Sequence, residues 1–461
     1  MSKNPIKIAV LGAGPAGLTT AHQLTKNGFV VDVYDTAKEV GGFAKSIRLW
    51  DRNIEIGPHF LDVGNKAVVK ELVLTALAGK YKPYERRTFI LSLNKLFIYP
   101  PGPADLIKKL SVKQLLAATA GMLKQVFSAP TPNDGTAGIF VKKYLGEFLH
   151  KNFFESFCTK LWSLNGDQVS DVFAKALLGF NDFSSPVRLI SRKLTQRLQL
   201  KKEPANYIYP TNGFSDLWNA LKTQTELQGG KFCLGVSINK LVCTASRDSI
   251  TQLVLADGTT KEYDLIICTI PVLSLIGLLK TQEGLSIIPH AAMTFRSDIL
   301  VYLKVHFDQA AEGQCIYIYS DLIKITRITN FNEFKPDESD TFNILLVEIW
   351  CDKTDLIWNY GDSDLMLFLE QEIKKTNLYI NLNVIDHTIK KVADAFQVPD
   401  LNLEDSRAKL LDQLVGFRNL YITGRIASLH FNYGMENAID DGIILAEEIT
   451  KKYQPELLQP D

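Results

Sequence analysis

Apolar and polar positions near the start of the chain follow the order strand, turn, helix, strand. Residues 6–11 and 30–34 are apolar runs of strand length, and residues 18–24 between them have the pattern of a helix. The turn after the first strand contains three glycines: Gly12, Gly14 and Gly17. This order predicts a βαβ unit at the beginning of a parallel sheet.

The pattern changes farther along the chain. Residues 106–127 form an amphipathic helical stretch that ends in a loop at 129–137, and residues 137–203 again look helical. From Lys231 the pattern is that of short strands, with ADGT as a turn between two of them. Further strands are expected at 299–305, 343–350 and 420–423, and a final helix from about Met435.

Composition narrows the class of protein. The chain has 461 residues, which predicts two or three domains. Lys and Arg number 51, as do Asp and Glu, so composition gives no basic field for nucleic acid or an anionic membrane surface. The six cysteines include no CxxC pair, which predicts reduced thiols without a metal site. Because no apolar run has membrane-spanning length and the first strand leaves no room for a signal peptide, a cytoplasmic protein with a small-molecule substrate is expected.

The glycine-rich turn indicates a bound nucleotide. Gly12 permits the tight turn, Gly14 lets the backbone approach a pyrophosphate, and Gly17 lets helix and strand pack closely, with Pro15 and Ala16 completing the loop. The phosphate then meets N–H groups at the helix N-terminus. Asp35, at the end of the second strand, is placed to accept hydrogen bonds from a ribose. A βαβ unit without a ligand is the alternative.

A second glycine pair distinguishes this chain from nicotinamide dehydrogenases. Gly41 and Gly42 follow Asp35 closely, and a return strand ends in IEIGPHF at residues 54–60. With these motifs the chain resembles the flavin amine oxidase superfamily over nearly its whole length, and the resemblance implies FAD lying along the glycine pair. It also implies that LGVSINKLV places the backbone of Val236 at the adenine, and YPTNGFSDLW is similar to the family's "YP-x-GG" segment.

Within that superfamily the chain resembles the protoporphyrinogen oxidase-like proteins and the UDP-galactopyranose mutases. GPHF resembles the mutases' GPH motif, TRITNF at 326–331 their Thr-Arg motif, and YITGRIASLHFNYGMENAIDDG their C-terminal signature. The resemblance places the following residues at the cofactor: Gly57, Pro58, His59, Gly424, Arg425, Gly434, Met435 and Glu436. A helix N-terminus near Met435 would stabilise negative charge on the reduced flavin; a plain surface helix is the alternative.

The substrate residues leave more alternatives open. Amine oxidases place a lysine behind the flavin, where this chain has Leu300, with Lys304 four residues away. Arg327 is a candidate to bind an anionic substrate group, or it pairs with a structural carboxylate. The mutases' second arginine has no clear equivalent, because Arg188 is too distant and Lys175 lacks the bidentate fork.

Aromatic residues and one histidine complete the candidate pocket. His59 is expected beside the flavin, as a hydrogen-bonding or acid–base group or as a packing residue. Trp162, Tyr209 and Tyr319 are pocket walls or core residues.

The expected fold class is α/β, a Rossmann-like FAD-binding domain with a discontinuous α+β substrate domain that has a helical part. The FAD domain is predicted at 1–75, 205–290 and 415–461, and the substrate domain at 76–204 and 291–414. His59, Arg327 and the helix near Met435 are predicted to converge on the flavin ring. The expected activity is hydride transfer from a small-molecule substrate to flavin, with Arg327 suited to an anionic group on that substrate. A mutase-like isomerase and a non-enzymatic escort-type relative are the alternatives.

Overall fold

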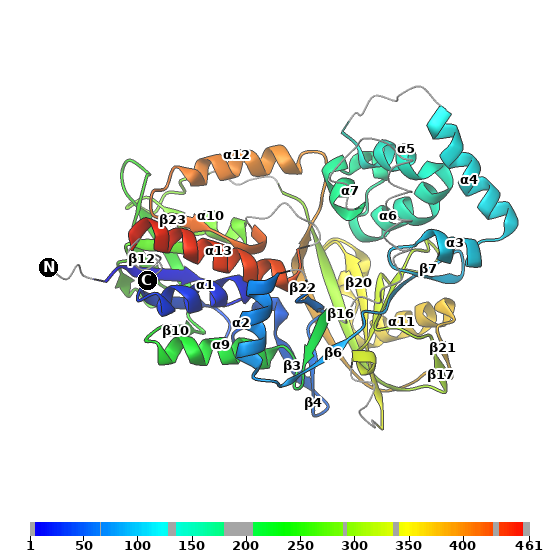
Figure 1. Ribbon diagram of the computed structural model, residues 1–461, viewed down its shortest axis with the longest axis horizontal. Helices are drawn as coiled ribbons and strands as arrows, with labels where there is room; N and C mark the ends of the chain where they lie inside the picture. Colours follow the sequence, from blue (N-terminus) through cyan, green and yellow to red (C-terminus); the bar gives the residue numbers. More distant parts are fainter. Residues whose placement is uncertain are drawn as a thin grey trace. The chain divides into compact units, whose positions relative to one another are not determined.

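The computed structural model describes residues 5–64, 66–127, 135–178, 206–288, 293–334, 341–426 and 433–454. The chain divides into two compact units (Figure 1). Unit 1 comprises Met1–Glu85, Ala205–Ala292 and Ser406–Asp461, and unit 2 comprises Arg86–Pro204 and Met293–Asp405.

Unit 1 is built on a parallel five-stranded sheet in the order β10-β2-β1-β14-β23. Its strands are β1 (Lys7–Leu11), β2 (Val30–Asp35), β10 (Lys231–Leu234), β14 (Leu265–Cys268) and β23 (Leu420–Ile422). Central β1 is an unbroken apolar run from Ile8 to Leu11 with every side chain fully buried, as expected for a parallel strand covered on both faces. Helix α1 (Pro15–Lys26) lies between α13 (Met435–Tyr453) and α9 (Ser215–Leu227) (Figure 1).

Smaller sheets complete unit 1. They comprise the hairpin of β3 (Ser46–Leu49) and β4 (Arg52–Glu55), and a sheet of β5 (Leu61–Asp62), β9 (Tyr207–Pro210) and β6 (Tyr81–Tyr84). A four-stranded sheet contains β11 (Ile238–Cys243), β12 (Ile250–Leu255), β13 (Thr260–Lys261) and β15 (Leu279–Lys280). The helices outside the central layer are α2 (Ala67–Leu77), α10 (Val272–Leu278) and most of α12 (Leu403–Val415).

Unit 2 is built on a seven-stranded sheet in the order β22-β16-β20-β19-β18-β7-β8. Its strands are β7 (Thr88–Ser92), β8 (Lys95–Ile98), β16 (Phe295–His306), β18 (Cys315–Ile318), β19 (Arg327–Asn330), β20 (Asn343–Cys351) and β22 (Asn383–Gln397). One face carries an apolar cluster that includes Val301, Val347 and Leu369, the last from α11 (Asp362–Thr376). Strand alternation places Arg327 and Glu348 on the opposite face.

The helical part of unit 2 begins with the amphipathic stretch expected over 106–127. It is helical and consists of two helices, α3 (Pro103–Lys109) and α4 (Val112–Phe127). Ser111 starts the second helix, because its hydroxyl accepts from the Gln114 N–H while its own N–H donates to the Gln114 side chain. Helices α5 (Ala137–Leu149), α6 (Ser156–Trp162) and α7 (Asp171–Leu178) follow, with a π-helical segment at His150–Glu155. Of the loop and helical stretch predicted at 129–203, residues 129–134 and 179–203 lie outside the described residues.

Candidate functional site

The glycine-rich turn in unit 1 has two glycines that the fold itself requires. Gly12 has φ +107°, and a Cβ there would lie 2.4 Å from Thr269 Oγ1. A Cβ on Gly17 would lie 1.9 Å from the carbonyl oxygen of Gly12. Gly12 therefore makes the turn and Gly17 permits close packing, the two roles expected from the motif.

Gly14 is different, because no described residue requires a glycine there. Its backbone is extended (φ −77°), and a Cβ would meet no atom of the described residues within 4 Å. It is the N-cap of α1, whose first turn has no side-chain cap, so backbone N–H groups point out of the helix end. Open space beside unused donors at a helix N-terminus fits the pyrophosphate of a dinucleotide.

Ala13 ties the two nucleotide-binding loops together. Its N–H donates to Asp35 Oδ2 at 2.8 Å, and its carbonyl accepts from the Gly41 N–H at 2.8 Å. Asp35 Oδ1 also accepts from the Ala37 N–H at 2.8 Å. Each carboxylate oxygen has a further lone pair, so Asp35 can hold its loop and still accept from ribose hydroxyls.

The YPTNGFSDLW segment packs against the loop of Gly41 and Gly42 through Trp218. Gly41 has φ +104°, and a Cβ there would lie 2.5 Å from Cδ1 of Trp218. Trp218 is fully buried, and its indole N–H donates to the Ala44 carbonyl at 2.7 Å. Gly42 lies against Gly14, since its Cβ would be 3.3 Å from the Gly14 Cα. Trp218 of this segment therefore helps to shape the loop of the glycine pair.

A buried carboxylate anchors this segment. Glu55 is 1% exposed and accepts hydrogen bonds from the Phe214 N–H, the Ser46 hydroxyl and the Tyr209 hydroxyl. Tyr209, considered as a pocket wall, is 3% exposed and is a core residue in the structure.

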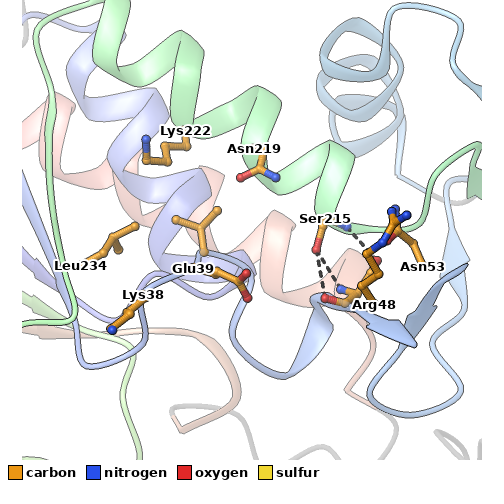
Figure 2. A pocket seen from close by; sticks show the side chains of 10 residues that line it. Lys38, Glu39, Arg48, Asn53, Ser215, Asn219, Lys222 and Leu234 are labelled. Atoms are coloured by element: carbon orange, nitrogen blue, oxygen red, sulfur yellow. Dashed lines mark hydrogen bonds between the residues drawn. The ribbon is translucent and has the colours of Figure 1, made fainter. Parts of the chain in front are cut away.

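A pocket of about 400 Å³ lies between α9 and the β3–β4 hairpin (Figure 2). Its lining includes Lys38, Arg48, Asn219 and Lys222, and hydrogen bonds join Ser215 to Ser46 at its edge. Arg48 pairs with Asp51 and Lys222 with Glu226. No residue predicted to bind the cofactor lines this pocket.

A hydrogen bond to the loop of the glycine pair holds the His59 ring in place. Its Nε2 lies 2.7 Å from the Phe43 carbonyl oxygen, next to the glycine pair, so Nε2 carries the proton and donates. Gly57 and Pro58 lie just before it in the turn after β4, and a Cβ on Gly57 would meet no protein atom within 4 Å.

Val236 contacts the end of β2, and Gly424 lies against the start of α1. The Val236 N–H donates to the Asp35 carbonyl at 3.0 Å, so its carbonyl is the backbone group it can offer to an adenine. Gly424 has φ +78°, and a Cβ there would lie 2.8 Å from the Ala16 side chain. Arg425 follows with an exposed side chain. The intervening part of the C-terminal motif, residues 427–432, lies outside the described residues.

The N-terminus of α13 contains a buried carboxyl group. Gly434 is the N-cap, Met435 is 7% exposed, and the Glu436 side chain folds back so that its Oε1 lies 2.3 Å from where a Gly434 Cβ would be. Glu436 Oε2 is buried without a hydrogen-bond partner among the described residues. Burial raises the pKa of Glu436, and Asp62 raises it further. An unsatisfied oxygen at a helix N-terminus fits a ligand that supplies the missing partner.

In unit 2, Arg327 pairs with a carboxylate, the alternative that the sequence left open. Arg327 and Glu348 are directly opposed on β19 and β20, and the guanidinium donates from Nε and Nη2 to the two Glu348 oxygens. The Glu348 side chain is 1% exposed and that of Arg327 is 13% exposed. Because Glu348 balances its charge, Arg327 alone does not give this face a net positive charge.

Asp298 lies on the same face of the sheet. It is 3% exposed, and its Oδ1 has no hydrogen-bond partner among the described residues. Burial raises the pKa of Asp298 well above its ordinary value, and the neighbouring Glu348 carboxylate raises it further. Both effects favour the protonated, neutral form of Asp298.

A stack of two arginines and two tyrosines was not predicted from the sequence. The Arg327 Nη1 donates to the Tyr317 hydroxyl at 3.0 Å, and its guanidinium lies 5.3 Å from the Tyr317 ring centre. The Tyr317 and Tyr99 rings are 5.5 Å apart, and Arg86 lies 6.0 Å from the Tyr99 ring. Arg86 also donates from Nε to Thr88 Oγ1 at 3.1 Å. We call these four residues the Arg–Tyr stack.

Other candidates in unit 2 have structural roles. Lys175 pairs with Asp171 at 2.6 Å, and Arg188 lies outside the described residues. Trp162 and Tyr319 are 2% and 6% exposed and pack against other aromatic rings. Leu300 is 3% exposed, and Lys304 lies over the Phe342 ring at 4.3 Å, about 13 Å farther along the strand by strand geometry. His59 and Arg327 belong to different units, so their convergence stays a prediction.

Comparison with known proteins agrees with the resemblance seen in the sequence. The family model for flavin-containing amine oxidoreductases matches residues 15–450. No curated protein sequence gives a significant match.

Solved structures of similar fold include three informative ones. A reduced UDP-galactopyranose mutase has 16% identity and a TM-score of 0.79, with 98% of each chain covered. A candidate protoporphyrinogen oxidase from Exiguobacterium sp. has 17% identity and a TM-score of 0.72, with 98% of this chain and 100% of the other covered. Putrescine oxidase bound to putrescine has 14% identity and a TM-score of 0.60, with 96% and 99% covered.

At these identities the structural likeness establishes the fold, which is the α/β fold expected from the sequence. The family match extends over most of the chain, and the site geometry in unit 1 fits a dinucleotide. The chain therefore belongs to the flavin-containing amine oxidoreductase family, and its cofactor is FAD.

Proposed function

We propose that this protein is an FAD-dependent oxidoreductase that takes a hydride from a small organic substrate bearing an anionic group. The observation that carries the proposal is the Arg–Tyr stack, which supplies two guanidinium groups and two phenols on one sheet face. Guanidinium groups match phosphate and carboxylate in geometry as well as charge. Leu300, buried where amine oxidases have a lysine, argues against amine oxidation.

The residues of unit 1 would hold FAD in an extended form. The N–H groups of α1 and the paired glycines would receive the pyrophosphate, Asp35 the ribose, and the Val236 carbonyl the adenine. Arg425 would add a positive charge near the phosphates. When bound, FAD supplies a ring that accepts the hydride.

Two side chains of unit 1, His59 and Glu436, would act as hydrogen-bonding and acid–base groups. His59 would act as a hydrogen-bonding or acid–base group at the flavin, with its ring oriented by the hydrogen bond from Nε2 to the Phe43 carbonyl. Glu436, whose pKa is raised by burial, would hold a proton on its unsatisfied carboxyl group and donate it in a hydrogen bond.

Arg86 would provide the charge that the substrate recognises. Glu348 compensates Arg327, so Arg327 would orient the substrate through the Tyr317 hydroxyl while Arg86 balances an anionic group. The positive charge of Arg86 acts on its neighbours. Burial raises the pKa of Tyr99 and of Cys315, and Arg86 lowers both pKa values in part. Arg86 would therefore take the role of the mutases' second arginine, for which the sequence motifs gave no clear equivalent.

The test is anaerobic mixing of the oxidised holoenzyme with a panel of amines, organic acids and phosphate esters while the flavin absorbance is recorded. We expect bleaching by an anionic compound and none by putrescine. Bleaching by amines alone would contradict the proposal. With the active compound, Arg86→Ala should raise KM about tenfold or more at unchanged FAD content. Arg87→Ala is the matched control, because Arg87 pairs with Glu333 at 2.6 Å.

A second candidate is a mutase-like isomerase acting on a nucleotide sugar, in which no net oxidation occurs. Arg86 of the Arg–Tyr stack favours it, since a guanidinium suits a phosphate group in geometry and charge. Conversion of UDP-galactopyranose to its furanose isomer by the dithionite-reduced enzyme, with no bleaching of oxidised flavin by any compound, would select this candidate. Rapid reoxidation of the reduced flavin by oxygen would favour the oxidoreductase.

A further inference from the structure

Helix α4 presents an apolar stripe to solvent. Val112, Leu116 and Leu123 are 77%, 64% and 57% exposed, and they follow one another at the i, i+4, i+11 spacing of a single helix face. On the preceding helix, Ile107 is 61% exposed. We call these four residues the apolar stripe. Large apolar side chains that gather on one exposed face mark an interaction surface.

The opposite face of α4 is the one that packs within unit 2. Ala118 is 5% exposed, and a Cβ on Gly146 of α5 would lie 2.7 Å from the carbonyl carbon of Gly121. Figure 1 shows α4 alongside α5 at the edge of unit 2. Because Gly121 and Gly146 already join the two helices, packing against α5 gives no reason for the apolar stripe.

Lysines border the apolar stripe. Residues 103–127 contain four lysines, Lys108, Lys109, Lys113 and Lys124, but a single acidic residue, Asp105. Asp105 is 8% exposed and pairs with Lys109 at 2.7 Å. Lys108 and Lys113 are exposed and have no acidic partner among the described residues. The chain as a whole has zero formal net charge, so this positive charge is local.

We propose that α3 and α4 bind the surface of an anionic lipid bilayer. The apolar stripe would enter the boundary between headgroups and acyl chains, and the bordering lysines would contact anionic headgroups. The helix would lie in the plane of the surface. Among the described residues no helix is long and apolar enough to cross a bilayer.

Charge favours a lipid surface over a second copy of the chain. A symmetric contact through this face would bring the same lysines against each other, and like charges at close range oppose association. An anionic surface instead gains from every lysine that reaches it, and this gain weakens as salt screens it.

The test is sedimentation of the full-length holoenzyme with vesicles of phosphatidylglycerol and phosphatidylcholine in equal parts, and with phosphatidylcholine alone. We expect binding to the anionic vesicles that falls as salt is raised. Leu116→Ser/Leu123→Ser and Lys113→Glu/Lys124→Glu should each lower the partition coefficient about tenfold or more. Flavin content reports that each variant is folded.

Matched controls use exposed residues elsewhere. Leu227 and Leu322 are each 83% exposed, so Leu227→Ser/Leu322→Ser should leave vesicle binding unchanged, as should Lys70→Glu. Equal loss in these controls, or no binding to anionic vesicles, would overturn the proposal. So would a dimer, seen by light scattering, that Leu116→Ser/Leu123→Ser converts to a monomer while vesicles bind neither form.

Discussion

The indole nitrogen of Trp218 donates a hydrogen bond of 2.7 Å to the carbonyl oxygen of Ala44. This contact joins residues 174 positions apart and fixes the loop that contains Gly41 and Gly42. It gives the YPTNGFSDLW segment a physical role, which is to support this loop through Trp218.

Trp218→Phe tests this support. Phenylalanine keeps much of the ring but removes the donor, so the buried Ala44 carbonyl loses its partner at a cost of about 1–3 kcal/mol. We expect a lower Tm and an FAD Kd raised about tenfold, measured by fluorescence titration of the apoprotein. Trp358→Phe, in unit 2, is the control and should leave the Kd unchanged. An unchanged Kd in Trp218→Phe would show that the loop holds its shape without this bond.

Removing Glu348 should destabilise unit 2. Glu348→Ala leaves the Arg327 guanidinium largely buried without its carboxylate, which costs about 3–5 kcal/mol, read as a lower urea midpoint. The double variant Arg327→Met/Glu348→Leu removes both charges and should recover most of that loss. If the double variant were as unstable as the single one, the pairing would not account for the effect.

Asp298 should make stability depend on pH in a defined direction. Its folded pKa is raised above its unfolded value of about 3.9, so the folded state binds the extra proton. Stability contributed by this group is therefore complete below about pH 4 and is lost as pH rises toward the folded pKa. Asp298→Asn removes this loss, so the Tm of the variant relative to the parent should rise from acidic to alkaline pH.

The control for Asp298→Asn is Asp394→Asn, whose side chain is 51% exposed and pairs with Lys353. Its Tm difference should not grow with pH in this way. A Tm difference for Asp298→Asn that was the same across the pH range would mean that Asp298 is ionised in the folded protein.

The sequence predicted those parts of the site that depend on local spacing. The roles of Gly12 and Gly17 and the order of the first strands follow from residues close together in the chain. The amphipathic pattern predicted the helical stretch over 106–127. The start of a second helix within it is encoded by Ser111 and Gln114, which have the spacing of a capping box.

Contacts between distant segments could not be predicted. Glu348 pairs with Arg327 because β19 and β20 are neighbours in the sheet, and no local pattern encodes that strand order. Trp218 of α9 reaches Ala44, which is 174 positions away in the chain. The balanced composition likewise gave no sign of a basic surface, because the acids that offset the lysines of α3 and α4 lie elsewhere in the chain.

The most direct measurement is the FAD content and thermal stability of Gly14→Ala beside the parent and Gly17→Ala. The parent should contain one FAD per chain. An alanine at Gly14 has room in the protein, so the Tm of the apoprotein should be unchanged while the Kd for FAD rises about tenfold or more. Gly17→Ala should fail to fold, because its Cβ would lie 1.9 Å from the Gly12 oxygen. Full FAD binding by a stable Gly14→Ala protein would contradict the account of this loop as the pyrophosphate site.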